Sequence, residues 1–103
     1  MLTFENVFEI FKDYLEADKD IEVVLTKRGY LRLLWDSSEC SIEEDALCKT
    51  PEELFDRLLS DCEDYHLYLL TKGKREQTDA DRALAKAQCA VYLDRKQAIV
   101  GRA

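Results

Sequence analysis

The chain contains little glycine or proline and has no long hydrophobic run. It has 3 Gly and 1 Pro among 103 residues, a content that excludes collagen-like and linker-rich proteins. The longest unbroken apolar run is Cys89–Leu93, far short of the roughly 20 residues that a membrane-spanning helix needs. The first five residues, Met1–Glu5, resemble neither the basic nor the apolar part of a secretory signal. We therefore expect a cytoplasmic protein without a membrane partner.

The common motifs of catalytic and metal sites are also missing. The sequence has no glycine-rich phosphate loop and no Gly-x-Ser-x-Gly segment. Its 4 cysteines include no Cys-x-x-Cys pair, which argues against a zinc ribbon or a thioredoxin-like site. The acidic segment 36–45 lacks the alternating ligands and central glycine of an EF-hand loop. We therefore expect a protein that is not an enzyme and has no catalytic residues, metal or cofactor.

One pair of potential metal ligands lies on a predicted helix. Cys62 and His66 are four residues apart, so they share a helix face and could hold a metal or form a thiolate–imidazole pair. Two ligands do not complete a zinc site, and the sequence favours a structural histidine beside a core cysteine. An enzyme built on this pair is the third of three functional hypotheses.

What the chain does contain is enough apolar sequence for one α+β domain over residues 1–103. The hydrophobic content is 47%, too high for a disordered chain, and the length suits a single core. Apolar residues at spacings of three and four predict a helix over residues 4–17, capped by Thr3. Two strand-like runs, 21–27 and 30–36, predict a β-hairpin in which Gly29 supplies a positive φ. We expect Ile21, Val23 and Leu25 to share one side of the first strand, and Leu31, Leu33 and Trp35 one side of the second.

Residues 37–49 allow three interpretations. They are read here as an irregular segment, with a short third strand around Glu39–Ile42 and a helical turn as the alternatives. Thr50 and Pro51 then predict the start of a helix of about 21 residues, with Glu53 closing a capping box and Gly73 ending the helix. This helix either lies at the centre of the domain or joins a homodimer.

A last helix begins at Thr78 and should run antiparallel to the preceding one, because the link over residues 73–77 is short. Its predicted buried positions are Ala80, Ala83, Leu84, Ala87, Ala90 and Val91, with Leu93 or Tyr92. The predicted architecture is an N-terminal helix, a β-hairpin with a possible short third strand, and an antiparallel pair of helices.

The charge is strongly acidic and unevenly placed. The chain has 22 Asp and Glu against 15 Lys and Arg, a net charge of -7. Residues 1–64 hold 18 acidic and 7 basic residues, a balance of −11, whereas residues 65–103 hold 4 and 8, a balance of +4. Such asymmetry indicates either pairing between the two parts or an acidic surface for a basic partner. Direct nucleic-acid binding is disfavoured, because phosphates would repel the acidic part.

The acidic residues that we predict to contact a partner come from the first helix and from residues 39–64. They are Glu5, Glu9, Asp13, Glu16, Glu39, Glu43, Glu44, Asp45, Asp61, Glu63 and Asp64. Carboxylates four residues apart on a helix repeat about every 6 Å, a spacing that can imitate a row of backbone phosphates.

In its small size, acidity, missing catalytic motifs and predicted α+β layout, the chain resembles phage and mobile-element inhibitors of the anti-CRISPR type. The resemblance is one of general character and involves no diagnostic motif. It implies a protein–protein interaction in which a nucleic-acid mimic blocks the basic surface of an RNA-guided nuclease. The second hypothesis is a mobile-element accessory or scaffold protein that homodimerises, with the acidity serving solubility only. The protein is thus expected to be a monomer or a homodimer.

Overall fold

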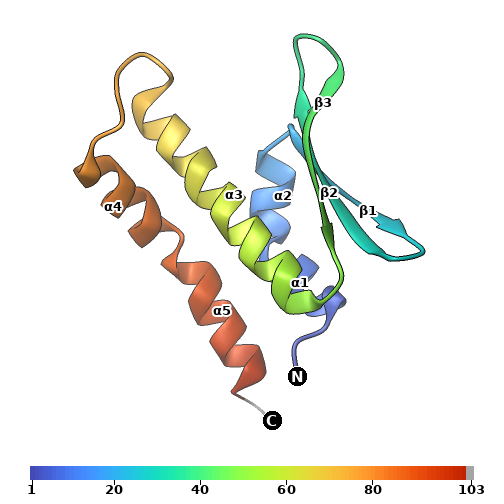
Figure 1. Cartoon of the computed structure of the whole chain (residues 1–103). Coiled ribbons are helices and arrows are strands. Elements are labelled where there is room, and N and C mark those ends of the chain that lie inside the picture. The colour runs from blue at the N-terminus through green and yellow to red at the C-terminus, as the bar shows by residue number, and fades with distance from the viewer. Residues whose placement is uncertain (102–103) are drawn as a thin grey trace.

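The computed structural model describes residues 1–101 and has an α+β fold (Figure 1). The elements, in chain order, are α1 (Phe4–Ile10), α2 (Lys12–Ala17), β1 (Ile21–Thr26), β2 (Gly29–Asp36), β3 (Ser41–Cys48), α3 (Pro51–Thr71), α4 (Asp79–Gln88) and α5 (Ala90–Val100). The three strands form one antiparallel sheet in the order β1-β2-β3. None of the helices in this part of the chain combines the length and apolar character of a bilayer-spanning segment.

The long helix α3 lies in the middle of the molecule, as one of the two alternatives predicted. The sheet is on one side of it and the α4–α5 pair on the other, with α1 and α2 beside it (Figure 1). The buried core combines residues of α1, α2, α3, the sheet and α5. Phe11 is at its centre, fully buried, with its ring stacked on Tyr92 at 4.8 Å between centroids.

The predicted N-terminal helix over residues 4–17 is bent. α1 and α2 meet at Phe11, whose backbone (φ −100°, ψ 14°) departs from helical geometry. The Phe11 N–H donates to the Val7 carbonyl of α1 at 3.1 Å, and the Leu15 N–H of α2 donates to the Phe11 carbonyl at 2.8 Å, so hydrogen bonding continues on both sides of the bend. Thr3 caps α1 as predicted, in a reciprocal box with Asn6. At the bend, the Phe11 ring is buried between Phe55 of α3 and Tyr92 of α5.

The β-hairpin is confirmed, with a turn at Lys27 and Arg28 and a positive φ of 136° at Gly29. Each predicted set of alternating residues does share a side, but the two sets lie on opposite faces of the sheet. Ile21 and Val23 pair with Leu34 and Arg32, and this face packs on the helices.

The prediction of an irregular segment at residues 37–49 is wrong. Residues 37–40 form a turn, and Ser41–Cys48 form the third strand, β3, which is longer than the alternative of a short strand around Glu39–Ile42. β3 pairs with β2 along its length, with an irregularity between Leu34 and Trp35. Backbone pairing with β2 overrides the weak strand propensity of these acidic residues, most of which face solvent.

The long helix is confirmed, including its cap. The Thr50 hydroxyl accepts from the Glu53 N–H at 3.2 Å, and Pro51 is the first helical residue. The predicted capping box is wrong in one detail, because the Glu53 carboxylate accepts from the N–H of Lys49 at 2.8 Å. The helix ends at Lys72 in the left-handed region, and Gly73 follows with φ 68°.

The prediction of one last helix with an alanine-rich buried side is wrong. The segment divides at Cys89 into α4, which packs against α3, and α5, which packs against α1. The buried residues are Asp81, Ala85, Cys89 and Tyr92. Alanine occurs on all sides of this helix, so the pattern did not define one face. An acid can occupy the buried stripe because Arg75 pairs with Asp81 through two hydrogen bonds.

The hairpin turn provides a test of the fold. A Cβ at Gly29 would lie 2.6 Å from the Cys48 carbonyl oxygen, and φ 136° is strained for other residues. We expect Gly29→Ala to lower the free energy of unfolding by about 1–3 kcal/mol, measured by urea denaturation. Lys27→Ala, in the same exposed turn, is the control and should stay within about 0.5 kcal/mol of the wild type. Equal stability of the two variants would contradict the turn geometry.

Candidate partner-binding surface

The structure divides the predicted contact residues into three groups. The first group lies on α1 and α2 and consists of Glu5, Glu9, Asp13 and Glu16. The second lies in the β2–β3 turn and on β3 and consists of Glu39, Glu43, Glu44 and Asp45. The third lies on α3 and consists of Asp61, Glu63 and Asp64. Glu44 of β3 lies near Asp61 and Asp64 of α3. Glu63 instead lines a separate cavity with Arg82 and Lys86, and the α1–α2 group lies beside α5.

The α1–α2 group is partly neutralised by the basic end of the chain. Arg95 on α5 donates to both carboxylate oxygens of Asp13, at 3.1 and 3.3 Å, and to the Ile10 carbonyl at 2.8 Å. Partial burial raises the pKa of Asp13, but the hydrogen bonds from Arg95 and the Tyr14 N–H outweigh it and hold that pKa below its usual value. Asp13 is therefore engaged inside the molecule.

Ion pairs between the acidic and the basic part of the chain are rare among the described residues. Among the ion pairs of residues 1–101, Arg95–Asp13 is the one that joins residues 1–64 to residues 65–101. The others pair acids and bases within the same part of the chain. Internal pairing between the two parts therefore leaves most of the acidic excess of the first part uncompensated.

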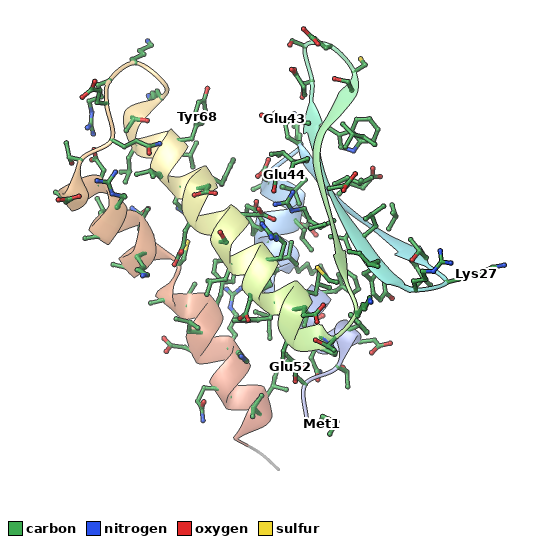
Figure 2. All side chains as sticks on the ribbon, in the orientation of Figure 1. Met1, Lys27, Glu43, Glu44, Glu52 and Tyr68 are labelled. Atoms are coloured by element: carbon green, nitrogen blue, oxygen red, sulfur yellow. The ribbon has the colours of Figure 1, made fainter. Side chains whose placement is uncertain are left out.

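Part of this excess surrounds a cavity of about 370 Å³ between α2, the sheet and the C-terminal half of α3. We call it the acidic groove. Its lining residues are Tyr14, Asp18, Asp20, Ile21, Leu34, Asp61, Asp64, Tyr65 and Tyr68. Figure 2 shows Tyr68 on α3 and Glu43 and Glu44 on β3 at this same end of the molecule. Asp61 and Asp64 were predicted contact residues, whereas Asp18 and Asp20 were missed.

Asp18 and Asp20 are held in place where α2 gives way to β1. The Tyr14 hydroxyl donates to Asp18 Oδ2 at 2.8 Å, and burial together with this bond raises the pKa of Tyr14. The Asp20 carboxylate accepts from Ser37, and its carbonyl accepts from the Trp35 N–H at 2.8 Å. These bonds connect the α2 end to the β2–β3 turn and fix one wall of the groove. The Asp-Lys-Asp spacing at a helix end is the sequence signal that could have indicated them.

The wall between the sheet and α3 depends on Arg32, which is 1% exposed. Its Nη2 donates to Asp61 Oδ1 at 2.7 Å and to Glu44 Oε1 at 3.0 Å. Arg57 approaches the same Glu44 oxygen at 3.7 Å. A buried guanidinium must be paired, and here one carboxylate comes from α3 and the other from β3.

The second oxygen of Asp61 has no hydrogen-bond partner, and neither do Arg32 Nε and Nη1. Burial raises the pKa of Asp61 to about 6, against the opposing effect of Arg32. Burial and the nearby Glu44 also raise the pKa of Asp64. Because Glu44 also neutralises Arg32, Asp61 can take up a proton without leaving the guanidinium unpaired. Asp61 is 9% exposed and lines the groove.

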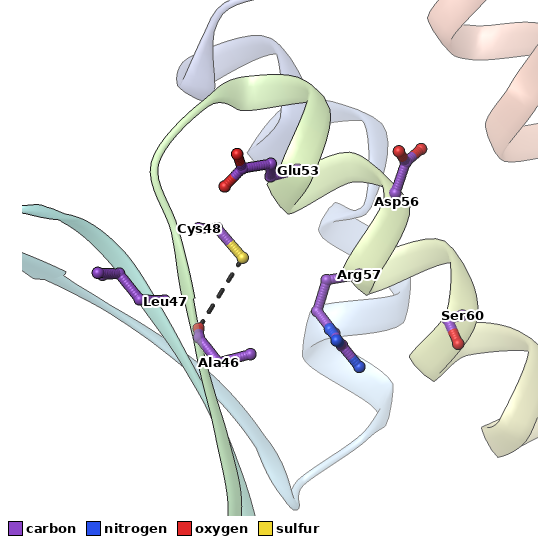
Figure 3. Close-up of a pocket in the computed structure, with 7 residues that line it drawn as sticks. All are labelled: Ala46, Leu47, Cys48, Glu53, Asp56, Arg57 and Ser60. Carbon is purple, nitrogen blue, oxygen red and sulfur yellow. Dashed lines mark hydrogen bonds between the residues drawn. The ribbon is translucent and has the colours of Figure 1, made fainter.

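A second cavity, of about 410 Å³, lies between β3 and the N-terminal half of α3 (Figure 3). Its walls carry Glu53, Asp56 and Arg57, together with the Cys48 thiol, which lies 3.9 Å from the Ala46 carbonyl oxygen. Burial raises the pKa of this thiol, which disfavours a reactive thiolate. With a base among its acids, this cavity adds little to the acidic surface.

Comparison of the chain with protein-family models, curated proteins and solved structures finds no match.

The shifted pKa of Asp61 predicts how stability depends on pH. The Asp61 carboxyl has an ordinary pKa near 3.8 in the unfolded chain and a pKa of about 6 in the folded protein, so the folded protein keeps this proton up to a higher pH. Between about pH 4 and pH 7 it therefore makes the protein less stable as the pH rises. We expect the wild type to lose stability relative to Asp61→Asn over this range, measured by urea denaturation at several pH values. A wild type that instead gains stability relative to the variant would show that Arg32 lowers the pKa of Asp61.

Proposed function

We propose that this protein is a non-catalytic inhibitor that covers a basic, nucleic-acid-binding surface of a partner protein with the acidic groove and the carboxylates beside it. The observation that carries the proposal is the lack of internal compensation: one ion pair links the acidic part to the basic part within residues 1–101. Charge held at a surface without internal partners is available to attract a basic protein and to speed its association.

The layout of the groove supports the same proposal. Four carboxylates line one cavity together with three tyrosine rings: Asp18 and Asp20 from the link between α2 and β1, and Asp61 and Asp64 from α3. A Lys or Arg side chain of a partner would find negative charge at this site and an aromatic face to lie on. The rigid elements that hold these groups reduce the ordering cost on binding.

The partner that we propose is an RNA-guided nuclease, following the resemblance to anti-CRISPR inhibitors. Such a nuclease holds its nucleic acids in a positively charged channel and reads a short duplex motif with arginine side chains. An acidic domain seated there would exclude the target DNA without any chemical step.

A charge-reversal experiment tests the placement of the contact. Within residues 1–101, Glu43 and Asp64 take part in no ion pair, so Glu43→Lys with Asp64→Lys leaves the bonds of Arg32 intact. We expect this double variant to bind guide-loaded nucleases at least tenfold more weakly than the wild type, and to inhibit cleavage of duplex DNA correspondingly less. Wild-type affinity should fall as salt rises from about 50 to 200 mM.

The matched control is Glu5→Lys with Glu9→Lys on α1, which changes the net charge equally outside the groove. It should retain most of the affinity. Equal weakening by the two double variants would remove the groove as the contact site. If none of a panel of RNA-guided nucleases binds the wild type, the proposed class of partner is wrong.

A homodimeric scaffold is the second candidate, and one observation favours it. Apolar residues predicted to be buried in the last helix face solvent instead, with Leu84 48% and Val91 41% exposed. In a homodimer a second copy would cover them.

Light scattering of the wild type at several concentrations measures the mass. A dimer that Leu84→Lys dissociates, and that Leu25→Lys at the hairpin does not, would support the scaffold. A monomer at all concentrations would exclude it.

A further inference from the structure

Three potential metal ligands meet where α3 faces the bend between α4 and α5. Cys62 and His66 on α3 are joined there by Cys89, and one ligand atom from each lies within 4.8 Å of the other two. The two sulfur atoms are 3.5 Å apart, with the Cys89 thiol donating to Cys62. The sequence pattern indicated Cys62 and His66 as a pair but indicated no third ligand. The antiparallel packing of α4 on α3 supplies it.

The cluster is formed by the fold as a whole. Cys89 is the residue at which α4 ends and α5 begins, and it is 1% exposed. Cys62 is fully buried at the middle of α3. Burial raises the pKa of both thiols, which disfavours either sulfur as a free nucleophile. Soft sulfur ligands beside an imidazole are the donors that zinc prefers.

The imidazole has a supporting partner of the kind that orients metal-binding histidines. His66 Nδ1 lies 3.1 Å from Oε1 of Gln88, the residue next to Cys89. With Nδ1 donating to this amide oxygen, Nε2 carries the free lone pair. Ring orientation is thus coupled to the same bend that positions Cys89.

We propose that Cys62, His66 and Cys89 bind one Zn²⁺ ion, which fastens the α4–α5 bend to α3. In tetrahedral zinc sites with Zn–S bonds near 2.3 Å, the sulfur atoms are about 3.8 Å apart. The observed 3.5 Å requires an adjustment of only a few tenths of an ångström. Three protein ligands leave a fourth position for water, and His66 borders a cavity of about 320 Å³ with Asp13 and Tyr92 that could supply it. This site is separate from the acidic groove and does not depend on the proposed inhibition.

Metal content and coordination can be measured on the untagged, reduced full chain. After dialysis against zinc and removal of the excess, elemental analysis should find one zinc per chain. With Co²⁺ as the probe, the protein should develop the visible bands of tetrahedral cobalt and a thiolate-to-cobalt charge-transfer band, and zinc should abolish both. Zinc should also raise the melting temperature, because it binds the folded state preferentially.

Variants assign the ligands. Cys62→Ser and Cys89→Ser should each lose the bound zinc, and His66→Asn should weaken binding at least tenfold. Cys40→Ser is the matched control, because Cys40 is exposed in the β2–β3 turn, and it should bind zinc as the wild type does. The cobalt spectrum of the wild type needs no variant and stands even if a cysteine variant fails to fold.

Three results would overturn the proposal. The first is reduced, folded wild type without stoichiometric zinc or a cobalt–thiolate band. The second is a Cys62–Cys89 disulfide in freshly isolated protein, since the short sulfur–sulfur distance would then reflect a redox pair. The third is a Cys40→Ser variant that loses as much zinc as Cys62→Ser.

Discussion

Arg32 is the buried charge on which the packing of the sheet against α3 depends. Its guanidinium lies in the interface, with Asp61 of α3 at 2.7 Å and Glu44 of β3 at 3.0 Å. An apolar side chain at this position would pack almost equally well in several positions of α3 against the sheet. The paired guanidinium keeps both of its hydrogen bonds in only one of these positions. Losing one partner would leave a buried charge partly unpaired, which is strongly destabilising. The acidic groove lies beside this contact, because Asp61 both pairs with Arg32 and lines the groove.

Local signals were sufficient for the elements that carry their own start and stop. Thr50 and Pro51 begin α3, Gly29 shapes the hairpin, and Thr3 and Thr78 cap the helices that follow them. β3 has no such signal. Its exposed side chains mix the acids Glu43, Glu44 and Asp45 with Ile42 and Leu47, and its strand conformation comes from hydrogen bonds to β2. The bend at Cys89 has neither proline nor glycine and arises because α4 and α5 pack against different helices, which a single stretch of sequence does not record.

The candidate sites also depend on contacts between distant segments, which local sequence signals do not predict. Charge counting selected acidic residues that the structure places on α3 and β3. It could not separate exposed Glu43 from buried Asp61, since the burial of Asp61 involves Arg32 from a third element. Asp18 and Asp20 join the groove only because β1 and β2 bring the end of α2 beside α3. Cys62 and Cys89 are 27 residues apart, a separation that matches no metal-binding spacing, and only helix packing makes them neighbours.

The order of the strands has a consequence for how the chain folds. Because β1, β2 and β3 are adjacent in both sequence and space, each strand pair forms by closing one short loop, at little cost in chain entropy. Local contacts of this kind form quickly. The meander can therefore assemble early, while Asp61 must be brought to Arg32 across 29 residues. We expect the docking of α3, with its buried charges, to be the slow step that commits the chain to the native state.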